Sequence, residues 1–354
     1  MASPGYMSAN PMVPACTWRP VFVVGSARSG TTLIYHTLLS TGEYAVYRGE
    51  PAVFDLLAAR FGKLDSRAAR ERLMRVWPRS HLARASGYVE PAHCDTLVEE
   101  CRNTGDFLRR VMSAMAERQG VDKWAVWGPD NLLLMPWIKR EMPDARFIHM
   151  IRDGRDIALS MHTKGFIRPF PWDRAHQLVV SALHWQWKLL RGRRDGRRLG
   201  ADYLELRFEA LVSQPQEALA AVSRFLGHSF DYQQILRSSV GTLRDSNSTF
   251  KNDGSNPVER WRQRLTPAQL AQVEQVIGGT LDGLGYPLAA QAQASPPVRL
   301  RWLYPAFFEV KHLLRTHTPL GRMVDDRRMR LDEPTMTSVP GQQPAPARAS
   351  SESA

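Results

Sequence analysis

Residues 21–33 have the sequence Val21-Phe22-Val23-Val24-Gly25-Ser26-Ala27-Arg28-Ser29-Gly30-Thr31-Thr32-Leu33. The four apolar residues at the start predict a buried strand, and the apolar spacing after Thr32 predicts a helix. A loop bounded by Gly25 and Gly30 lies between them. Such a strand–loop–helix turn directs backbone N–H groups and the positive end of the helix toward one point, an arrangement that binds phosphate.

This loop departs from the ATP- and GTP-binding loop at one position. The spacing from Gly25 to Gly30 fits G-x-x-x-x-G-K-[ST], but Thr31 stands where that motif has lysine. Phosphoryl transfer in the manner of that motif is therefore disfavoured. The loop instead carries Arg28, whose forked guanidinium suits an anionic group. The alternative is a plain glycine turn that only joins the strand to the helix.

A second segment, residues 143–160, repeats the order of strand, turn and helix. Residues 147–151 are predicted to form a strand, and Asp153 is predicted to cap the helix that follows. The alternative for its charged residues is an Arg–Asp lattice on the surface. In that lattice Arg152 and Arg155 would pair with Asp153 and Asp156.

Together the two segments resemble sulfotransferases, enzymes that use 3′-phosphoadenosine-5′-phosphosulfate (PAPS). The first is similar to the 5′-phosphosulfate-binding loop of the bacterial and tyrosylprotein branch, which has an Arg-Ser-Gly-Thr-Thr core. This resemblance implies that Arg28 holds the 5′-phosphosulfate and stabilises charge on the leaving phosphate. It assigns the same binding role to Ser29, Gly30, Thr31 and Thr32.

The second segment resembles the part of the family that binds the 3′-phosphate. The resemblance implies that Arg152 and Ser160 are the ligands, because an arginine at a strand end and a serine on the next helix can converge on one phosphate. Lys164 matches a basic cofactor-binding position in tyrosylprotein sulfotransferases. Further candidates for the 3′-phosphate are Lys251, Arg260 and Arg262, for which surface roles stay equally open.

Glu50 resembles the acidic residue that follows the second strand of related sulfotransferases and serves as catalytic base. An acceptor hydroxyl is a poor nucleophile until a nearby carboxylate takes its proton. The alternative is that Glu50 caps a helix that starts near Pro51.

Two positions depart from the family pattern. Many relatives have a lysine two residues before the proline that matches Pro129, and Trp127 stands there in this chain. Either Arg28 or another basic group replaces that lysine, or the alignment slips at this point, or catalysis is weak. Phe208 replaces a tyrosine that is frequent in relatives, so one cofactor hydrogen bond is missing.

The alternation of strands and helices predicts an α/β fold. The resemblance implies a P-loop-like three-layer sandwich, with a central parallel sheet flanked by helices and the cofactor at the carboxyl edge of the strands. The basic residues between 188 and 198 are predicted to form a solvated turn. The expected divisions are a flexible arm (1–18), a sulfotransferase domain (19–287), a linker (288–298), a basic amphipathic segment (299–330) and a disordered tail (331–354).

Residues 299–330 contain eight basic and three acidic residues, with apolar residues at helical spacing. They are predicted either to pack back on the domain, burying Trp302 and Phe307, or to lie on an anionic membrane as a peripheral contact. Pro305 and Pro319 limit the helix to about four turns. We favour packing on the domain.

The composition, 43% hydrophobic and 23% charged over 354 residues, indicates a soluble globular protein. The net charge of +12 permits an anionic cofactor, an anionic membrane or nucleic acid as partner. Motifs that bind nucleic acid are not evident, so nucleic acid is not expected. The three cysteines have no metal-binding spacing, so we expect no metal and a cytoplasmic location.

The expected function is transfer of a sulfuryl group from PAPS to a hydroxyl or amine. The acceptor is open among carbohydrate, lipid, peptide and secondary metabolite, and the sequence indicates no oligomeric state. Two alternatives remain at this point. One is a P-loop nucleotide-dependent kinase, and the other is a non-catalytic nucleotide-binding or membrane-peripheral protein.

Overall fold

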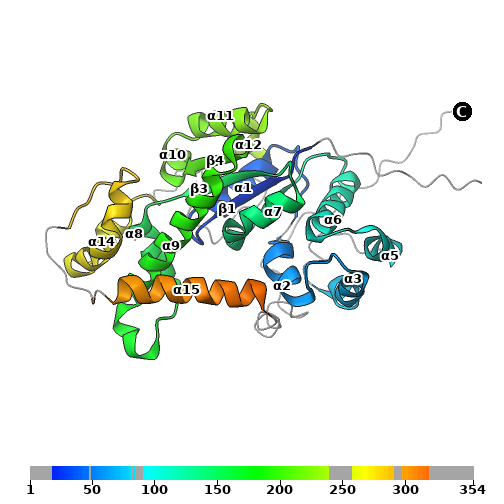
Figure 1. Ribbon diagram of the computed structural model, residues 1–354. Coiled ribbons are helices and arrows are strands. Elements are labelled where there is room, and N and C mark those ends of the chain that lie inside the picture. Colours follow the sequence, from blue (N-terminus) through cyan, green and yellow to red (C-terminus); the bar gives the residue numbers. More distant parts are fainter. Residues whose placement is uncertain are drawn as a thin grey trace, which may run out of the picture.

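Four parallel strands form the central sheet, in the order β2–β1–β3–β4. The computed structural model describes residues 18–47, 49–80, 83, 91–238, 257–290, 297 and 299–318. The strands are β1 (Val21–Gly25), β2 (Ala125–Trp127), β3 (Arg146–Ile151) and β4 (Tyr203–Arg207). Val21 pairs with Ala125 on one side and Arg146 on the other. Because all strands run in one direction, their carboxyl ends meet at a single edge (Figure 1).

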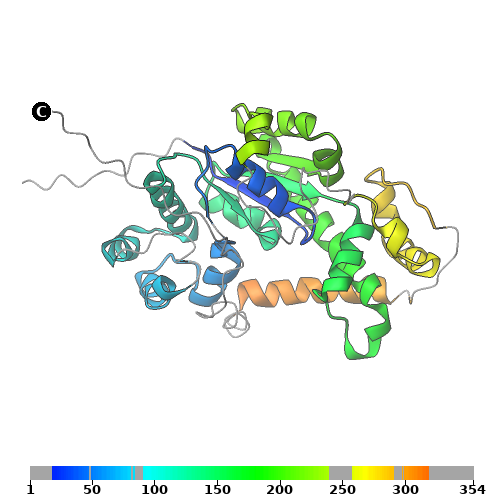
Figure 2. The same cartoon turned by 180° about the vertical axis from the view of Figure 1, so that it is seen from behind.

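Helices cover both faces of this sheet, which confirms the predicted α/β sandwich of three layers (Figures 1 and 2). Side chains alternate along each strand, so Val23 faces one layer and Phe22 the other. The layer on the Val23 face contains α1 (Thr31–Ser40), α10 (Phe208–Ser213), α11 (Pro215–Leu226) and α12 (Tyr232–Ser238). The opposite layer contains α6 (Thr104–Arg118), α7 (Met135–Glu141) and α9 (Gln177–Arg197).

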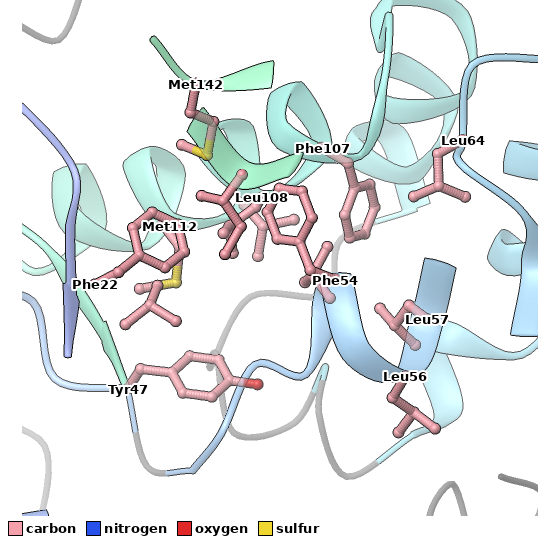
Figure 3. Close-up of a cluster of buried hydrophobic side chains, with 14 of the residues drawn as sticks. Phe22, Tyr47, Phe54, Leu56, Leu57, Leu64, Phe107, Leu108, Met112 and Met142 are labelled. Carbon is pink, nitrogen blue, oxygen red and sulfur yellow. The ribbon is translucent and has the colours of Figure 1, made fainter. Parts of the chain in front are cut away.

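An apolar core fills the space on the Phe22 face (Figure 3). The Phe22 ring packs against Phe54 and Phe147, with centroids 6.4 and 5.4 Å away. This core fixes the segment that follows Glu50 to the sheet. The short elements of that segment are the π-helix η1 (Val53–Leu57), α2 (Ala58–Phe61), α3 (Arg67–Met74), the 3₁₀ turn η2 (Trp77–Arg79) and α5 (Pro91–Glu100).

The remaining elements lie in the connections between the strands and after β4. They are three 3₁₀ turns, η3 (Pro129–Leu134), η4 (Pro171–His176) and η5 (Gly200–Asp202), and the helices α8 (Gly154–Lys164), α13 (Trp261–Arg264), α14 (Pro267–Asp282) and α15 (Leu300–His317). As predicted, Asp153 is the N-cap of α8, and its side chain accepts from the Arg155 amide at 2.8 Å. Within the described ranges, no helix has the length and apolar character needed to cross a membrane.

Two expectations about exposed segments are wrong. Residues 188–198 mostly continue α9 instead of forming a solvated turn, and Lys188 is buried, donating to Asp130 at 2.8 Å and to the Pro129 carbonyl at 3.0 Å. Trp18, expected in the flexible arm, donates its indole N–H to the Trp124 carbonyl at 3.2 Å. Most of the predicted arm and linker and all of the predicted tail lie outside the described residues.

Helix α15 packs back on the domain, as favoured, but with a different face from the one expected. It buries Leu300, Tyr304 and Phe308 against α9 and its neighbours. Trp302 is 77% exposed instead of buried, and Phe307 is only half-buried. The expectation that Trp302 would be buried is therefore wrong. The second half of the segment, residues 319–330, lies outside the described residues.

The turn between β1 and α1 depends on two glycines. Gly30 is the N-cap of α1 with φ 95°, and a side chain there would clash with the Phe208 ring. A Cβ on Gly25 would lie 2.8 Å from the Met150 carbonyl oxygen and 2.5 Å from Ser29 Oγ. Between them Arg28 adopts φ 72°, a left-handed conformation that is unfavourable for a non-glycine residue. The loop is therefore held in a strained shape by close packing.

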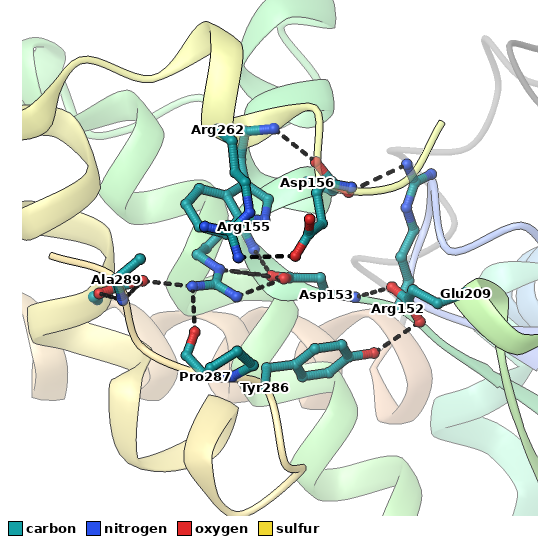
Figure 4. A network of polar contacts seen from close by, with 12 residues as sticks. Arg152, Asp153, Arg155, Asp156, Glu209, Arg262, Tyr286, Pro287 and Ala289 are labelled. Atoms are coloured by element: carbon teal, nitrogen blue, oxygen red, sulfur yellow. Dashed lines mark hydrogen bonds and ion pairs between the residues drawn. The ribbon is translucent and has the colours of Figure 1, made fainter. Parts of the chain in front are cut away.

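A buried arginine joins the start of α8 to the C-terminal part of the domain (Figure 4). Arg155 is 1% exposed and pairs with Asp153 at 2.7 Å and Glu274 of α14 at 2.5 Å. It also donates to the Pro287 carbonyl at 2.9 Å and stacks 3.8 Å above the Trp261 ring. The anticipated surface lattice is therefore wrong in one respect: the Arg155–Asp153 pair exists, but it is buried and structural.

Gly30→Ala should destabilise the protein by about 2–4 kcal/mol, because backbone strain and the clash with Phe208 add. Gly227→Ala is the matched control, since Gly227 is also left-handed (φ 79°, ψ 25°) and a Cβ on it would meet no atom within 4 Å. That control should cost only about 1 kcal/mol of strain. Urea unfolding measures both, and equal losses would show that Phe208 does not enforce the glycine.

Arg155→Met should destabilise the protein by about 3–5 kcal/mol, because it leaves two buried carboxylates without their cation. Arg262→Met is the control: Arg262 stacks on the same Trp261 ring at 4.3 Å, but it is paired with Glu259 in solvent. This second change should cost no more than about 1 kcal/mol. Urea unfolding of the two variants side by side tests the difference, and similar small losses would contradict a structural role for the Arg155 charge.

Candidate active site

A cleft of about 220 Å³ opens at the carboxyl edge of the sheet, between the N-terminus of α1, the outer side of α8 and residues 260–264. It brings together predicted residues that lie far apart in the sequence. Those that line it are Arg28, Gly30, Thr31, Thr32, Arg152, Ser160 and Lys164. The two predicted anion-binding segments therefore form one site.

The first wall of the cleft is the open N-terminus of α1. No side chain caps this helix. The Gly30 carbonyl accepts from the backbone amides of Leu33 and Ile34, so the helical amides that precede Leu33 point out of the open end of the helix. Ser29 does not line the cleft but is buried directly beneath it. Among the described residues, Ser26 Oγ and Ser29 Oγ are buried without a hydrogen-bond partner. These donors are available to an anion.

A direct hydrogen bond connects the two segments. Arg28 Nε donates to Ser160 Oγ on α8 at 3.0 Å. Arg152, at the end of β3, donates to the Arg28 carbonyl at 3.1 Å, which helps hold the left-handed turn at Arg28. The guanidinium of Arg152 also lies 4.1 Å above the Phe208 ring. The strand end, the loop and α8 thus position one another.

The charges in the cleft are mostly of one sign. Burial lowers the pKa of Arg28, and the nearby charge of Arg260 lowers it further. Burial also lowers the pKa of Arg152, although Asp156 and Glu209 oppose this shift. Cations that are desolvated and close to one another repel, so an anion that binds between them is stabilised.

Asp156 provides the one carboxylate that the described residues contribute to the cleft wall, and it holds residues 257–264 onto α8. Its oxygens accept from the backbone amides of Glu259 and Trp261, both at 3.0 Å. Burial raises the pKa of Asp156 to about 6, against the opposing charge of Arg152, 3.7 Å away. The predicted Arg152–Asp156 pair therefore exists, but it lies in the cleft wall, where Asp156 also holds residues 259–261, and not on an open surface.

The candidates from the late basic region have different outcomes. Arg260 lines the cleft, whereas Arg262 is exposed and paired with Glu259 at 2.9 Å. Lys251 lies outside the described residues. Sequence reasoning missed Arg264, which also lines the cleft. Its spacing of four residues from Arg260, one helical turn, is the signal that could have identified it.

The cleft lining does not include Glu50, which is half-buried beyond it. The helix-cap alternative for Glu50 is wrong, because η1 begins at Val53 with Ala52 as its N-cap and no capping side chain. Residues 44–47 form a single bridge, between Tyr44 and Lys123, instead of a strand. The Tyr35 hydroxyl donates to the Tyr47 carbonyl at 2.9 Å and so ties this segment to α1. The role of Glu50 as base stays a prediction.

Trp127 and Phe208, the two departures from the family pattern, have packing roles. Trp127 is half-buried and its ring centroid lies 6.1 Å from that of Tyr35. Phe208 is fully buried between Gly30 and Arg152. Among the described residues no group of three or more His, Cys, Asp or Glu side chains is arranged to hold a metal ion.

A profile of the sulfotransferase family matches residues 20–232. Carbohydrate sulfotransferase 7 of Mus musculus is 31% identical over 138 residues, which is 36% of this chain and 28% of the mouse protein. The chain thus aligns with less than a third of the length of that curated relative.

Among solved structures, the sulfotransferase domain of the Synechococcus PCC 7002 olefin synthase is 19% identical, with a TM-score of 0.47 over 73% of this chain and 94% of that domain. Sulfotransferase STF9 of Mycobacterium avium is 13% identical, with a TM-score of 0.44 over 77% of this chain and 79% of that protein. The profile match alone extends over more than half of the sequence and contains both segments that are predicted to bind anions. This chain belongs to the sulfotransferase family.

Proposed function

We propose that the protein transfers the sulfuryl group of PAPS to an acceptor hydroxyl. The observation that carries the proposal is the charge of the cleft. Among the described residues five cations line it, and Asp156 is the only carboxylate in that lining: Arg28, Arg152, Lys164, Arg260 and Arg264. A nucleotide with anionic groups at both its 5′ and 3′ ends needs two cationic subsites, and these residues come from the loop before α1, the end of β3, α8 and the 260–264 segment.

The residues present fit such a nucleotide. The open N-terminus of α1 and the partnerless Ser29 Oγ suit the 5′-phosphosulfate. Arg152, Ser160 and Lys164 suit the 3′-phosphate, which distinguishes PAPS from ATP. When bound, PAPS supplies the activated sulfuryl group. The proposal requires no metal, since the arginines themselves neutralise the charge.

In this mechanism the chain has two tasks. Arg28 and the amides at the start of α1 stabilise the charge that develops on the leaving phosphate. Glu50 takes the proton of the acceptor hydroxyl as the new bond to sulfur forms. Ser160, through its bond to Arg28 Nε, holds that guanidinium in place. Glu50 follows Tyr47 in the chain, and the hydrogen bond from Tyr35 to the Tyr47 carbonyl connects this segment to α1.

Thr31 at the position of the phosphate-binding lysine disfavours the kinase alternative. The acceptor is a small molecule, a glycan or a lipid under this proposal. A glycan hydroxyl is a candidate because the mouse relative is named a carbohydrate sulfotransferase. A cytoplasmic location is part of the proposal, and it is supported by the cysteine pattern of the sequence.

Arg152→Ala should weaken binding of 3′,5′-adenosine bisphosphate by about 1.5–3 kcal/mol, the usual contribution of a charge-assisted hydrogen bond. Calorimetry without magnesium measures it. Arg262→Ala should leave the affinity unchanged, since Arg262 does not line the cleft. Adenosine 5′-phosphate serves as the second ligand. If the substitution weakens both nucleotides equally, or if they bind the unmodified protein equally well, the assignment of Arg152 to the 3′-phosphate is wrong.

Glu50→Gln should lower turnover about 10²-fold, as expected on loss of a general base, with little change in nucleotide affinity. The measurement is transfer of labelled sulfate from PAPS to a pool of carbohydrate, lipid and peptide acceptors. Glu43→Gln is the control, because Glu43 is a half-exposed carboxylate of the same segment that pairs with Lys123 at 2.7 Å. Near-normal turnover of the Glu50 variant would place the base elsewhere.

A further inference from the structure

Helix α15 is apolar on both its inner and its outer face. Its inner face packs on α9, where the ring of Phe308 meets His184 edge-on at 4.9 Å and Trp187 at 5.6 Å. The residues left outside form a stripe along the helix, with steps of three or four residues between its successive turns. They are Trp302, Leu303, Ala306, Val310, Leu313 and Leu314. A helix that is apolar all round is normally buried on all sides or lies in a membrane interface.

The exposed apolar side chains of the molecule are concentrated here. Within the described ranges nine large apolar residues are exposed, and seven of them belong to α15 or to the segment 164–176 that precedes α9. From that segment come Phe166 and Trp172, the latter 68% exposed. Single exposed apolar residues are common, but a group of this size indicates an interaction surface.

The two segments are joined by aromatic contacts. The Phe170 ring stacks on Trp172 at 4.8 Å and packs against Tyr304 at 5.1 Å and Phe307 at 4.7 Å. In Figures 1 and 2 the 164–176 segment lies beyond the N-terminal half of α15, on the side away from the sheet. We define the apolar residues of both segments as the outer surface.

The charges that accompany the outer surface have one sign. Six basic residues of the two segments are exposed: Lys164, Arg168, Arg174, Arg299, Arg301 and Lys311. The acidic residues there are Asp173, which is buried and lies 4.0 Å from Arg299, and Glu309, which pairs with Arg191 and accepts from the Trp187 indole at 2.9 Å. An isologous contact between two copies would bring these basic residues against each other, which disfavours a dimer through this surface.

We propose that the outer surface binds a membrane that contains anionic lipid. The apolar side chains enter the boundary between headgroups and acyl chains, where tryptophan is favoured, and the basic residues contact the anionic headgroups. Lys164 lines the cleft, and it is also one of the exposed basic residues beside the outer surface. Membrane binding therefore holds the cleft close to the bilayer. The proposal goes beyond sulfuryl transfer and does not depend on it.

The test is co-sedimentation of the full-length protein with vesicles of phosphatidylcholine alone or with 30 mol% phosphatidylserine (about a third anionic lipid, enough for electrostatic attraction). Binding to the anionic vesicles and not to the neutral ones is expected, with loss at high salt. Trp302→Ser/Val310→Ser should lower partitioning about tenfold or more. Arg174→Gln/Lys311→Gln should lower it by roughly 25-fold, about fivefold for each charge.

The matched control is Leu288→Ser, an exposed leucine outside both segments, which should bind like the unmodified protein. Three results would overturn the proposal. One is that the full-length protein does not bind vesicles, which is the result expected if another part of the chain covers the outer surface. Another is equal binding by the Trp302/Val310 variant. The third is a dimer in solution that this variant abolishes, since a second copy would then occupy the surface.

Calorimetry with 3′,5′-adenosine bisphosphate separates this proposal from the enzymatic one. The Trp302/Val310 variant should keep full nucleotide affinity, because neither residue lines the cleft. Circular dichroism checks that it is folded. Lost vesicle binding with retained nucleotide binding supports the proposal. Retention of both contradicts it and leaves the proposed sulfuryl transfer intact.

Discussion

The cleft depends on the buried guanidinium of Arg152. One of its nitrogens donates to the Arg28 carbonyl, another to the Pro257 carbonyl at 2.6 Å, and its face covers Phe208. Segments that are distant in the sequence thus meet on one cation. A buried charge is costly unless it is hydrogen-bonded, so these partners are what keeps Arg152 at the site. The basic side chains of the cleft outnumber the acidic ones, so the cleft keeps a positive charge that can bind an anionic nucleotide.

Sequence reasoning succeeded where a signal is local. Residues 21–33 and 143–160 each contain a complete strand, turn and helix, and parallel strands bring their ends to one edge, so the fold and most of the cleft follow. It failed where partners are distant. The backbone amides of Glu259 and Trp261 donate to Asp156, which lies more than 100 positions away in the sequence, and no local sequence pattern predicts these hydrogen bonds. Periodicity also could not tell which apolar face of α15 is buried, because both faces are apolar.

The two departures from the family pattern have a common explanation in packing. Phe208 fills the space above Gly30 and stacks with Arg152, and a hydroxyl is not needed for either contact. Before the turn that follows β2 the chain has Trp127 instead of lysine, but the ammonium group of Lys188 on α9 contacts this turn. Lys188, whose side chain is buried, donates to the Pro129 carbonyl and to Asp130. The turn is thus fixed by a distant residue.

Helix α15 reaches that same turn from its other end. Arg315 lies 3.5 Å from Asp130 and donates to the Asp55 carbonyl of η1 at 3.1 Å, so the helix connects the turn after β2 with the segment that follows Glu50. Its inner face alone makes these contacts. An outer face that served only solubility would be polar, as on most helices at a surface. The apolar outer face is therefore the observation on which the proposed membrane contact rests, and the basic residues beside it favour an anionic surface.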